Sequence, residues 1–139
     1  MKMDIKIMLL FLLFVVLACG ISFWAETSPA VFDYRVIHNR ETRYDLLAAF
    51  ATALRINHPA AYDIIDPSLK PRLDEWMNTH QSKKCKNIPY FFMSGTGTKQ
   101  GSSVDLGCFG YDGPIHFEVD DIVIKDMQVI DWGEVLEGN

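Results

Sequence analysis

The chain of 139 residues has few basic side chains for its length: 13 Lys and Arg stand against 18 Asp and Glu, a formal net charge of −5. The deficit is greatest from Asp105 to Glu137, where nine acids accompany one base, Lys125. A surface of this charge repels nucleic acid and anionic lipid headgroups, so we expect no nucleic-acid partner. A solvated acidic surface is the simpler interpretation, and a cationic partner is the alternative.

Motifs that carry common chemistry are also missing. The sequence has no H-E-x-x-H, no G-x-S-x-G and no internal repeat. The stretch Ser94–Gly101 is rich in glycine and contains a lysine, but it lacks the G-x-x-x-x-G-K-[ST] pattern and precedes a strand. We therefore predict a hairpin loop there and not a phosphate loop. Asp120-Asp121 offers too few oxygen ligands for calcium. The sequence predicts no cofactor and no metal site.

Charge is absent altogether from Ile7–Ala25, a stretch of 19 residues. A helix of about 20 apolar residues spans the hydrocarbon core of a membrane, and a helix satisfies its own backbone polar groups there. Lys2 and Lys6 precede the stretch, whereas the first charge beyond it, Glu26, is acidic. The positive-inside bias therefore predicts a cytoplasmic N-terminus, with residues 26–139 on the extracytoplasmic side.

Two other interpretations of this stretch stay open. A cleaved signal peptide has a basic start, an apolar core of about 7–15 residues and a small-residue cleavage site, and Ile7–Ala18 fits that core. A lipoprotein signal is the sharper variant, because Val16-Leu17-Ala18-Cys19-Gly20 resembles a lipobox with Cys19 as the lipidated residue. The apolar run continues to Trp24, which favours an uncleaved anchor. All three interpretations send the rest of the chain to the same side of the membrane.

Cysteine is rare, with three in the chain, and two of these, Cys85 and Cys108, lie beyond the apolar stretch. On the oxidising side of a membrane, two cysteines in a small domain usually pair, so we predict a disulfide between them. The alternative is a metal site that adds His80 and His116 to the two cysteines, but these spacings match no standard zinc pattern. Two free thiols remain the third possibility if the domain is cytoplasmic.

About 110 residues follow the apolar stretch, enough for one domain with a single core. We predict a connector over residues 26–40 and a domain over residues 41–139. Capping residues and apolar stripes predict short helices in its first half, and alternating or β-branched stretches predict strands in its second half. The predicted helices are Thr42 to Leu54, Ala60 to Ile65 and Asp66 to Met77; the predicted strands are 88–93, 104–109, 115–119 with a continuation or restart at 122–124, and 127–132, with fraying from Gly133 onward. The predicted fold is therefore α+β, with about three short helices packed on one face of a curved antiparallel sheet.

This order of elements resembles the NTF2-like (cystatin-like α+β) domains. The resemblance covers about Glu41 to Val135 and rests on Ala60-Ala61-Tyr62 in a short Pro-started helix, on the helix from Leu69 to Trp76, and on the closing strand Val129-Ile130-Asp131-Trp132. It implies a cone-like fold with a pocket between helices and sheet. Enzymes of the family place Asp and His or Tyr in that pocket, but no such pair can be matched here residue by residue.

One pair of residues is a candidate for chemistry. His116 alternates out of phase with Ile115 and Phe117, so it faces the opposite side of its strand, where Asp105 could orient it as a general base. A solvent-facing histidine is the simpler interpretation. We therefore predict a membrane-tethered domain without catalysis that binds a protein partner or a small apolar ligand. The alternatives are a small hydrolase or isomerase of the same fold, or an accessory subunit of a membrane complex that packs through small residues such as Gly20 and Ser22.

Overall fold

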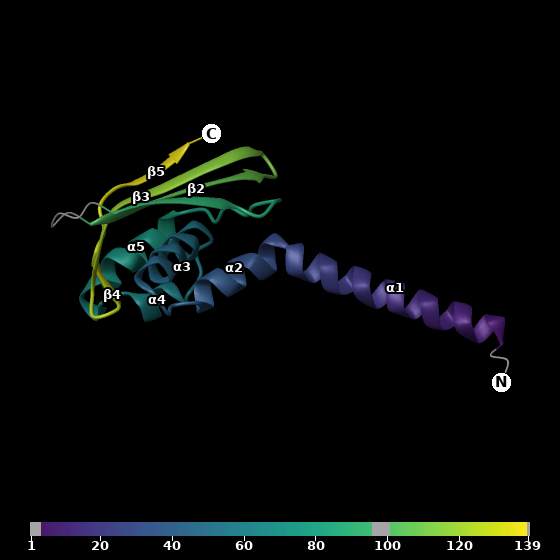
Figure 1. The fold of residues 1–139 in the computed structure, drawn as a ribbon. Helices are drawn as coiled ribbons and strands as arrows, with labels where there is room; N and C mark the ends of the chain where they lie inside the picture. The colour runs from purple at the N-terminus through teal and green to yellow at the C-terminus, as the bar shows by residue number, and fades with distance from the viewer. Residues whose placement is uncertain (1–3, 96–100, 139) are drawn as a thin grey trace.

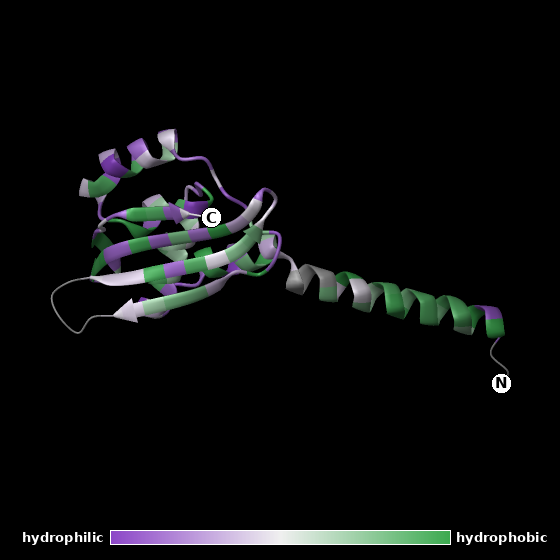
Figure 2. Cartoon of the chain, turned by 90° about the horizontal axis from the view of Figure 1, so that it is seen from above, coloured by the Kyte–Doolittle hydropathy of each residue, from purple (hydrophilic) through white to green (hydrophobic). Residues whose placement is uncertain are grey.

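The computed structural model describes residues 4–95 and 101–138. Its first helix, α1 (Ile5–Thr27), extends away from the remainder of the chain (Figure 1). Asp4 begins this helix, because its side chain accepts a hydrogen bond from the Lys6 amide. Within the described residues, one stretch, Ile5–Phe23, is long and apolar enough to cross a membrane, and a signal sequence would meet the same test. Figure 2 shows α1 apolar over most of its length.

The segment predicted as a connector forms a second helix, α2 (Pro29–His38), which packs along α3 (Arg43–Arg55). Ser28 is extended and separates α2 from α1. Pro29 takes the first helical position, where its missing N–H leaves no hydrogen bond unmade. Asp33 and Ile37 lie four residues apart on one face of α2, and both are buried. The connector is therefore part of the packed domain.

Side-chain caps begin the later helices where the sequence predicted them. The Asp45 amide donates to the Thr42 hydroxyl at 3.2 Å, and the Thr42 amide donates to the Asp45 carboxylate at 3.1 Å. This capping box confirms the predicted start of α3. Asp66 accepts a hydrogen bond from the Ser68 amide at 2.9 Å in the same way. The elements after α3 are α4 (Ala61–Ile64), a 3-10 turn η1 (Pro67–Leu69) and α5 (Lys70–Thr79).

An antiparallel sheet forms the second half of the chain. Its strands are β1 (Tyr90–Gly95), β2 (Ser102–Gly110), β3 (Gly113–Lys125), β4 (Gln128–Asp131) and β5 (Val135–Gly138). They pair in the order β1-β2-β3-β4, and β5 also pairs with β3. The predicted Ser94–Gly101 loop joins β1 to β2, and its residues 96–100 lie outside the described residues.

The prediction that the chain frays from Gly133 onward was wrong. The Gly133 amide donates to the Asp120 carbonyl, and β5 then pairs with β3, placing Glu137 opposite Phe117. The physical reason is the length of β3, which is 13 residues. Because β4 pairs with the last part of β3, Val123–Lys125, the first part of β3 has a free edge on that side, and the C-terminal residues fill it.

Helices α3, α4 and α5 cover one face of the sheet, and the core lies between these two layers (Figure 1). Phe50 of α3 packs edge-on against Trp132, with ring centroids 5.2 Å apart. Leu106 and Phe117 are fully buried on the facing side of the sheet. The described chain is thus an α+β domain with one apolar N-terminal helix, as predicted at that level.

The predicted disulfide between Cys85 and Cys108 is present, with Cα atoms 5.8 Å apart. The pairing of β1 with β2 brings the two cysteines close: Tyr90 lies opposite Gly107, and beyond this ladder an isolated bridge pairs Cys85 with Gly110. The bond joins the segment after α5 to the sheet. Because each sulfur is bonded to the other, the alternative of Cys85 and Cys108 as metal ligands does not apply to this structure.

Candidate functional site

The predicted pair His116 and Asp105 lies on neighbouring strands, β3 and β2, with Nδ1 of the histidine 3.1 Å from a carboxylate oxygen. Glu118 approaches Nε2 of the same ring at 3.8 Å. The ligand atoms of these three residues lie within 4.8 Å of one another, close enough to hold a metal ion. However, His116 and Asp105 are 47% and 37% exposed on the sheet face away from the helices. The two residues therefore meet on an open surface and not in a pocket.

Partial burial and neighbouring acids both raise the pKa of Glu118 in this group. Partial burial raises the pKa of Glu118 first of all, a hydrogen bond with Asp120 raises it further, and the charges of Asp120 and Asp105 add to the effect. The His116 ring opposes the shift only in part. The arrangement favours uptake of a proton by Glu118, and nothing in it shields a substrate from water.

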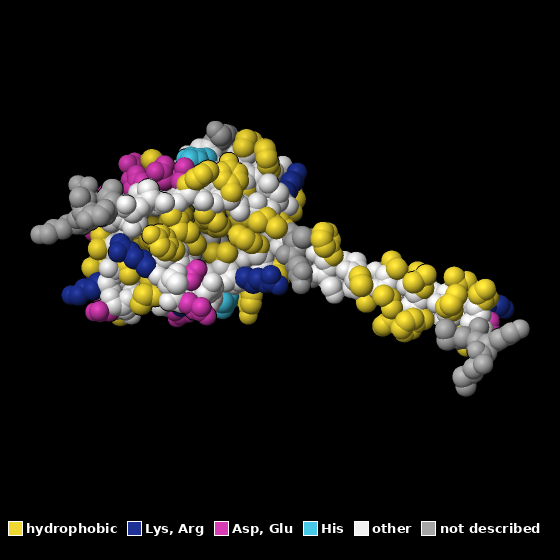
Figure 3. Space-filling view, viewed as in Figure 1, with side chains coloured by type: hydrophobic (Ala, Val, Ile, Leu, Met, Phe, Trp, Pro, Cys, Tyr) yellow, Lys and Arg dark blue, Asp and Glu magenta, His cyan; other side chains and the backbone are white. Residues whose placement is uncertain are grey.

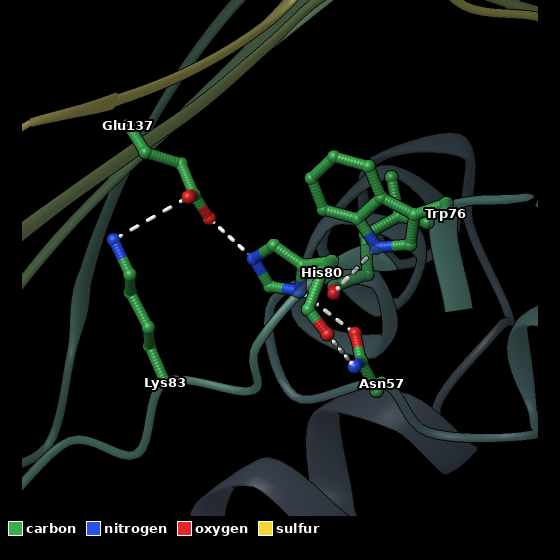
Figure 4. Close-up of polar contacts among 6 residues, drawn as sticks. Asn57, Trp76, His80, Lys83 and Glu137 are labelled. Carbon is green, nitrogen blue, oxygen red and sulfur yellow. Dashed lines mark hydrogen bonds and ion pairs between the residues drawn. The ribbon is translucent and has the colours of Figure 1, made fainter. Parts of the chain in front are cut away.

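A second histidine, His80, lies in a more enclosed setting (Figure 4). Its side chain is only 6% exposed and stacks on Trp76 with ring centroids 4.1 Å apart. Asn57 accepts at Nδ1 through its Oδ1 atom, at 2.7 Å, and Glu137 of β5 lies against Nε2. The Asn57 amide nitrogen donates to the His80 carbonyl, which fixes the orientation of that amide.

Asn57 and Glu137 thus hold the two ring nitrogens of His80, one on each side of the ring. Lys83 approaches the other oxygen of Glu137 at 3.4 Å. These contacts tie β5 to the end of α3 and to the segment after α5. His80 does not line either of the two cavities found in the described residues. We therefore interpret His80 as a structural residue that holds the C-terminal strand β5 in place.

A cavity of about 730 Å³ lies beside α2, at the end of the domain from which α1 departs. We call it the juxtamembrane pocket, because its wall begins directly after α1, the helix that is long and apolar enough to cross a membrane. Its walls come from the start of α2, from residues that follow α3, from the segment around the disulfide and from the β2–β3 turn. The lining residues are Ser28, Pro29, Ala30, Asp33, Tyr34, Ile37, Ile56, His58, Lys84, Cys85, Lys86 and Tyr111. A second cavity, of about 370 Å³, shares Lys84 and Tyr111 with it.

One residue that lines the juxtamembrane pocket, Asp33, belongs to a buried ion pair. Arg55, in the last turn of α3, is fully buried, and its Nη2 atom donates to Asp33 at 2.6 Å. Its other terminal nitrogen contacts Cys85 Sγ, so the guanidinium joins α2, α3 and the disulfide. Burial raises the pKa of Asp33, although the charge of Arg55 and its hydrogen bond pull in the opposite direction. Burial likewise lowers the pKa of Arg55.

Sequence reasoning did not identify the residues that build this pocket. It placed 26–40 outside the domain and did not consider Arg55. A usable signal was present: Ser28-Pro29 is a helix start, and Asp33 and Ile37 recur at the i, i+4 spacing of a helix face. The burial of Arg55 had no signal, because an arginine near the end of a helix usually faces water and favours the helix dipole.

Comparison of the chain with protein-family models, with curated proteins and with solved structures finds no match.

Proposed function

We propose that this protein is a membrane-tethered domain, without catalysis of its own, that binds a small and largely apolar ligand in the juxtamembrane pocket. The observation that carries the proposal is the pocket itself. Its volume of about 730 Å³ falls in the range of roughly 300–1,000 Å³ typical of small-molecule sites. Seven of its twelve lining residues are apolar or aromatic, among them Ile37 and Ile56, and the other five are polar or charged. Small-molecule sites likewise combine apolar walls with polar groups that orient the ligand.

The tether and its orientation are part of the same proposal. Ile5–Phe23 supplies an apolar helix of spanning length, and Lys2 and Lys6 favour a cytoplasmic N-terminus. The disulfide supports an oxidising compartment for the domain. We also propose an NTF2-like fold for the domain. In such a fold the ligand would lie between the helices and the sheet, but here Phe50, Leu106 and Phe117 fill that space. The proposed ligand would therefore lie in the pocket beside α2.

A small enzyme is the second candidate, and the 3.1 Å contact between His116 and Asp105 is the observation that favours it. The pair would act as general base and orienting group. Its open position on the sheet gives a substrate no enclosing wall, so we rank binding above catalysis.

Photolabelling tests the proposed function directly. The full chain would be reconstituted in nanodiscs of phosphatidylcholine with an uncharged long-chain alcohol that carries a diazirine, then irradiated and digested, and the labelled peptides identified by mass spectrometry. We expect labels in α2 and in the segment around Cys85, beyond those that any lipid probe leaves in α1. Ala30→Trp, which places an indole at the pocket wall, should abolish the α2 labels. Asn78→Trp, on an exposed position of α5, is the matched control. Equal labelling of both variants would refute the proposal.

A further inference from the structure

We propose that the ligand of the juxtamembrane pocket is a single-chain amphiphile with an anionic head, taken up at the membrane surface. This inference rests on the proposed function and specifies its ligand. It is carried by the position of the pocket relative to α1, by the side chains at its rim, by the charge of its lining and by its size.

The pocket lies next to the point where the chain leaves α1. The pocket wall begins at Ser28, Pro29 and Ala30, directly after α1 ends. Ser28 is five residues beyond Phe23, the last residue of the spanning stretch, and a rise of 1.5 Å per residue places it about 7.5 Å further along the helix. The headgroup layer on each side of a bilayer is about 5–8 Å thick. The near wall of the pocket therefore lies at the outer limit of the headgroups.

The rim of the pocket has the composition of a membrane interface. Tyr34 and Tyr111 both line it and are 63% and 73% exposed. The ammonium group of Lys86 lies 5.1 Å from the centroid of the Tyr111 ring. Tyrosine and lysine each combine an apolar body with a polar end, which suits them to the headgroup level. Figure 3 shows hydrophobic side chains on the part of the domain nearest α1, with Lys or Arg side chains among them.

Charged side chains line the pocket, and most of them are basic. Among the described residues that line the pocket, Asp33 is the one carboxylate, and the buried Arg55 balances it. Lys84 and Lys86 also line the pocket, and neither pairs with a carboxylate in the described part of the chain. A chain with net charge −5 thus has a local excess of positive charge at this place. Such an excess attracts an anionic group, and each ammonium can donate charge-assisted hydrogen bonds to it.

Size and apolar walls complete the description of the ligand. The walls of the pocket include Pro29, Ile37 and Ile56, which offer hydrocarbon to an acyl chain. A cavity of about 730 Å³ accommodates one such chain with its head, whereas both chains of a diacyl lipid exceed it. The expected ligand class is therefore that of fatty acids and lysophospholipids with an anionic head.

Two photoreactive probes with the same chain and diazirine, one ending in a sulfate and the other in a hydroxyl, test this inference in nanodiscs that contain the full chain. We expect the alkyl sulfate to label the pocket about tenfold more efficiently, equivalent to about 1.4 kcal/mol. Lys84→Gln combined with Lys86→Gln should remove this preference and leave labelling by the alcohol within about twofold. Lys70→Gln combined with Lys125→Gln changes the charge equally at exposed positions elsewhere and should leave the preference intact.

The outcomes separate the two levels of the proposal. If neither probe labels the pocket, the proposed function itself fails. If the alcohol labels the pocket and the sulfate does no better, or if both pairs of lysine changes lower sulfate labelling equally, the pocket binds an apolar ligand but the anionic head is wrong. A photoreactive phosphatidylglycerol that labels the pocket as well as the alkyl sulfate would overturn the single chain. Equal urea midpoints of the variants confirm that they are folded.

Discussion

The buried ion pair between Arg55 and Asp33 predicts a large and strongly coupled loss of stability when either partner is removed. Arg55 is fully buried, the side chain of Asp33 is 11% exposed, and the two groups are 2.6 Å apart. Removal of one member of such a pair leaves a charge in a medium that solvates it poorly, at a cost of about 3–5 kcal/mol. A natural domain has a free energy of unfolding of about 5–15 kcal/mol, so either single change removes a large share of it.

The two single changes should lower the free energy of unfolding by different amounts. Asp33→Asn leaves the Arg55 guanidinium, which stays ionised, without a counter-charge, and we expect a loss near the upper end, about 5 kcal/mol. Arg55→Met leaves Asp33, which borders the juxtamembrane pocket and can take up a proton because burial already raises its pKa. We expect a loss near the lower end, about 3 kcal/mol. The double variant buries no charge and should lose no more than Arg55→Met alone.

Urea unfolding of the full chain in nanodiscs, followed by tryptophan fluorescence, measures these differences, because Trp132 is buried in the core and becomes exposed. Lys70→Met is the matched control: it breaks the exposed pair between Lys70 and Asp74, which water screens, and should leave the urea midpoint nearly unchanged. If each single change lowers the free energy of unfolding by less than about 1 kcal/mol, and if the two losses add up in the double variant, the pair is neither desolvated nor coupled, and the prediction is refuted.

Two further predictions concern the disulfide and the acidic surface. Cys85→Ser and Cys108→Ser should each lower the free energy of unfolding by about 3.5 kcal/mol, which is the chain-entropy value for a loop closed over a separation of 23 residues. The double variant should lose no more than either single variant. Urea unfolding without reductant measures these losses, and additive losses would contradict the prediction. Burial and the acids Asp120 and Asp105 raise the pKa of Glu118 in the folded state. The contribution of Glu118 to the free energy of unfolding is therefore full below the pKa of the unfolded state, and it is lost as the pH rises through the pKa of the folded state. Glu118→Gln should therefore make the protein slightly more stable than the parent above that range, by a few tenths of a kcal/mol, and a thermal melt at pH 8 that shows the opposite sign would reject this view.

The local parts of the fold were predictable because their causes are local. Thr42 and Asp45 cap a helix whatever lies around them, and Asp66 followed by proline does the same, so the structure begins helices at both places. The cysteine pair could also be predicted, because antiparallel pairing around a short loop brings residues near its two ends together. Each of these features depends only on residues close together in the chain or on the pairing of two strands in one hairpin.

The C-terminal strand and α2 could not be derived in this way. Val135–Gly138 becomes β5 because β3 is longer than its partner β4 and has a free edge, and that mismatch exists only once the sheet has formed. His80 acquires its role for the same reason, since Glu137 reaches it only from β5. Residues 31–37 show no clean period in the sequence, and their burial in α2 depends on α3 lying alongside.

By itself, the sequence determined the apolar stretch from Ile7, the change from helices to strands and the disulfide, because composition, capping and periodicity act over a few residues. The tertiary structure decided which charged groups are buried and where a cavity remains. Arg55 appears in the sequence as an ordinary last-turn arginine, and it becomes the fully buried partner of Asp33 only because α2 and the disulfide close over it. The juxtamembrane pocket has the same origin, since its walls come from four separate segments whose meeting depends on long-range packing.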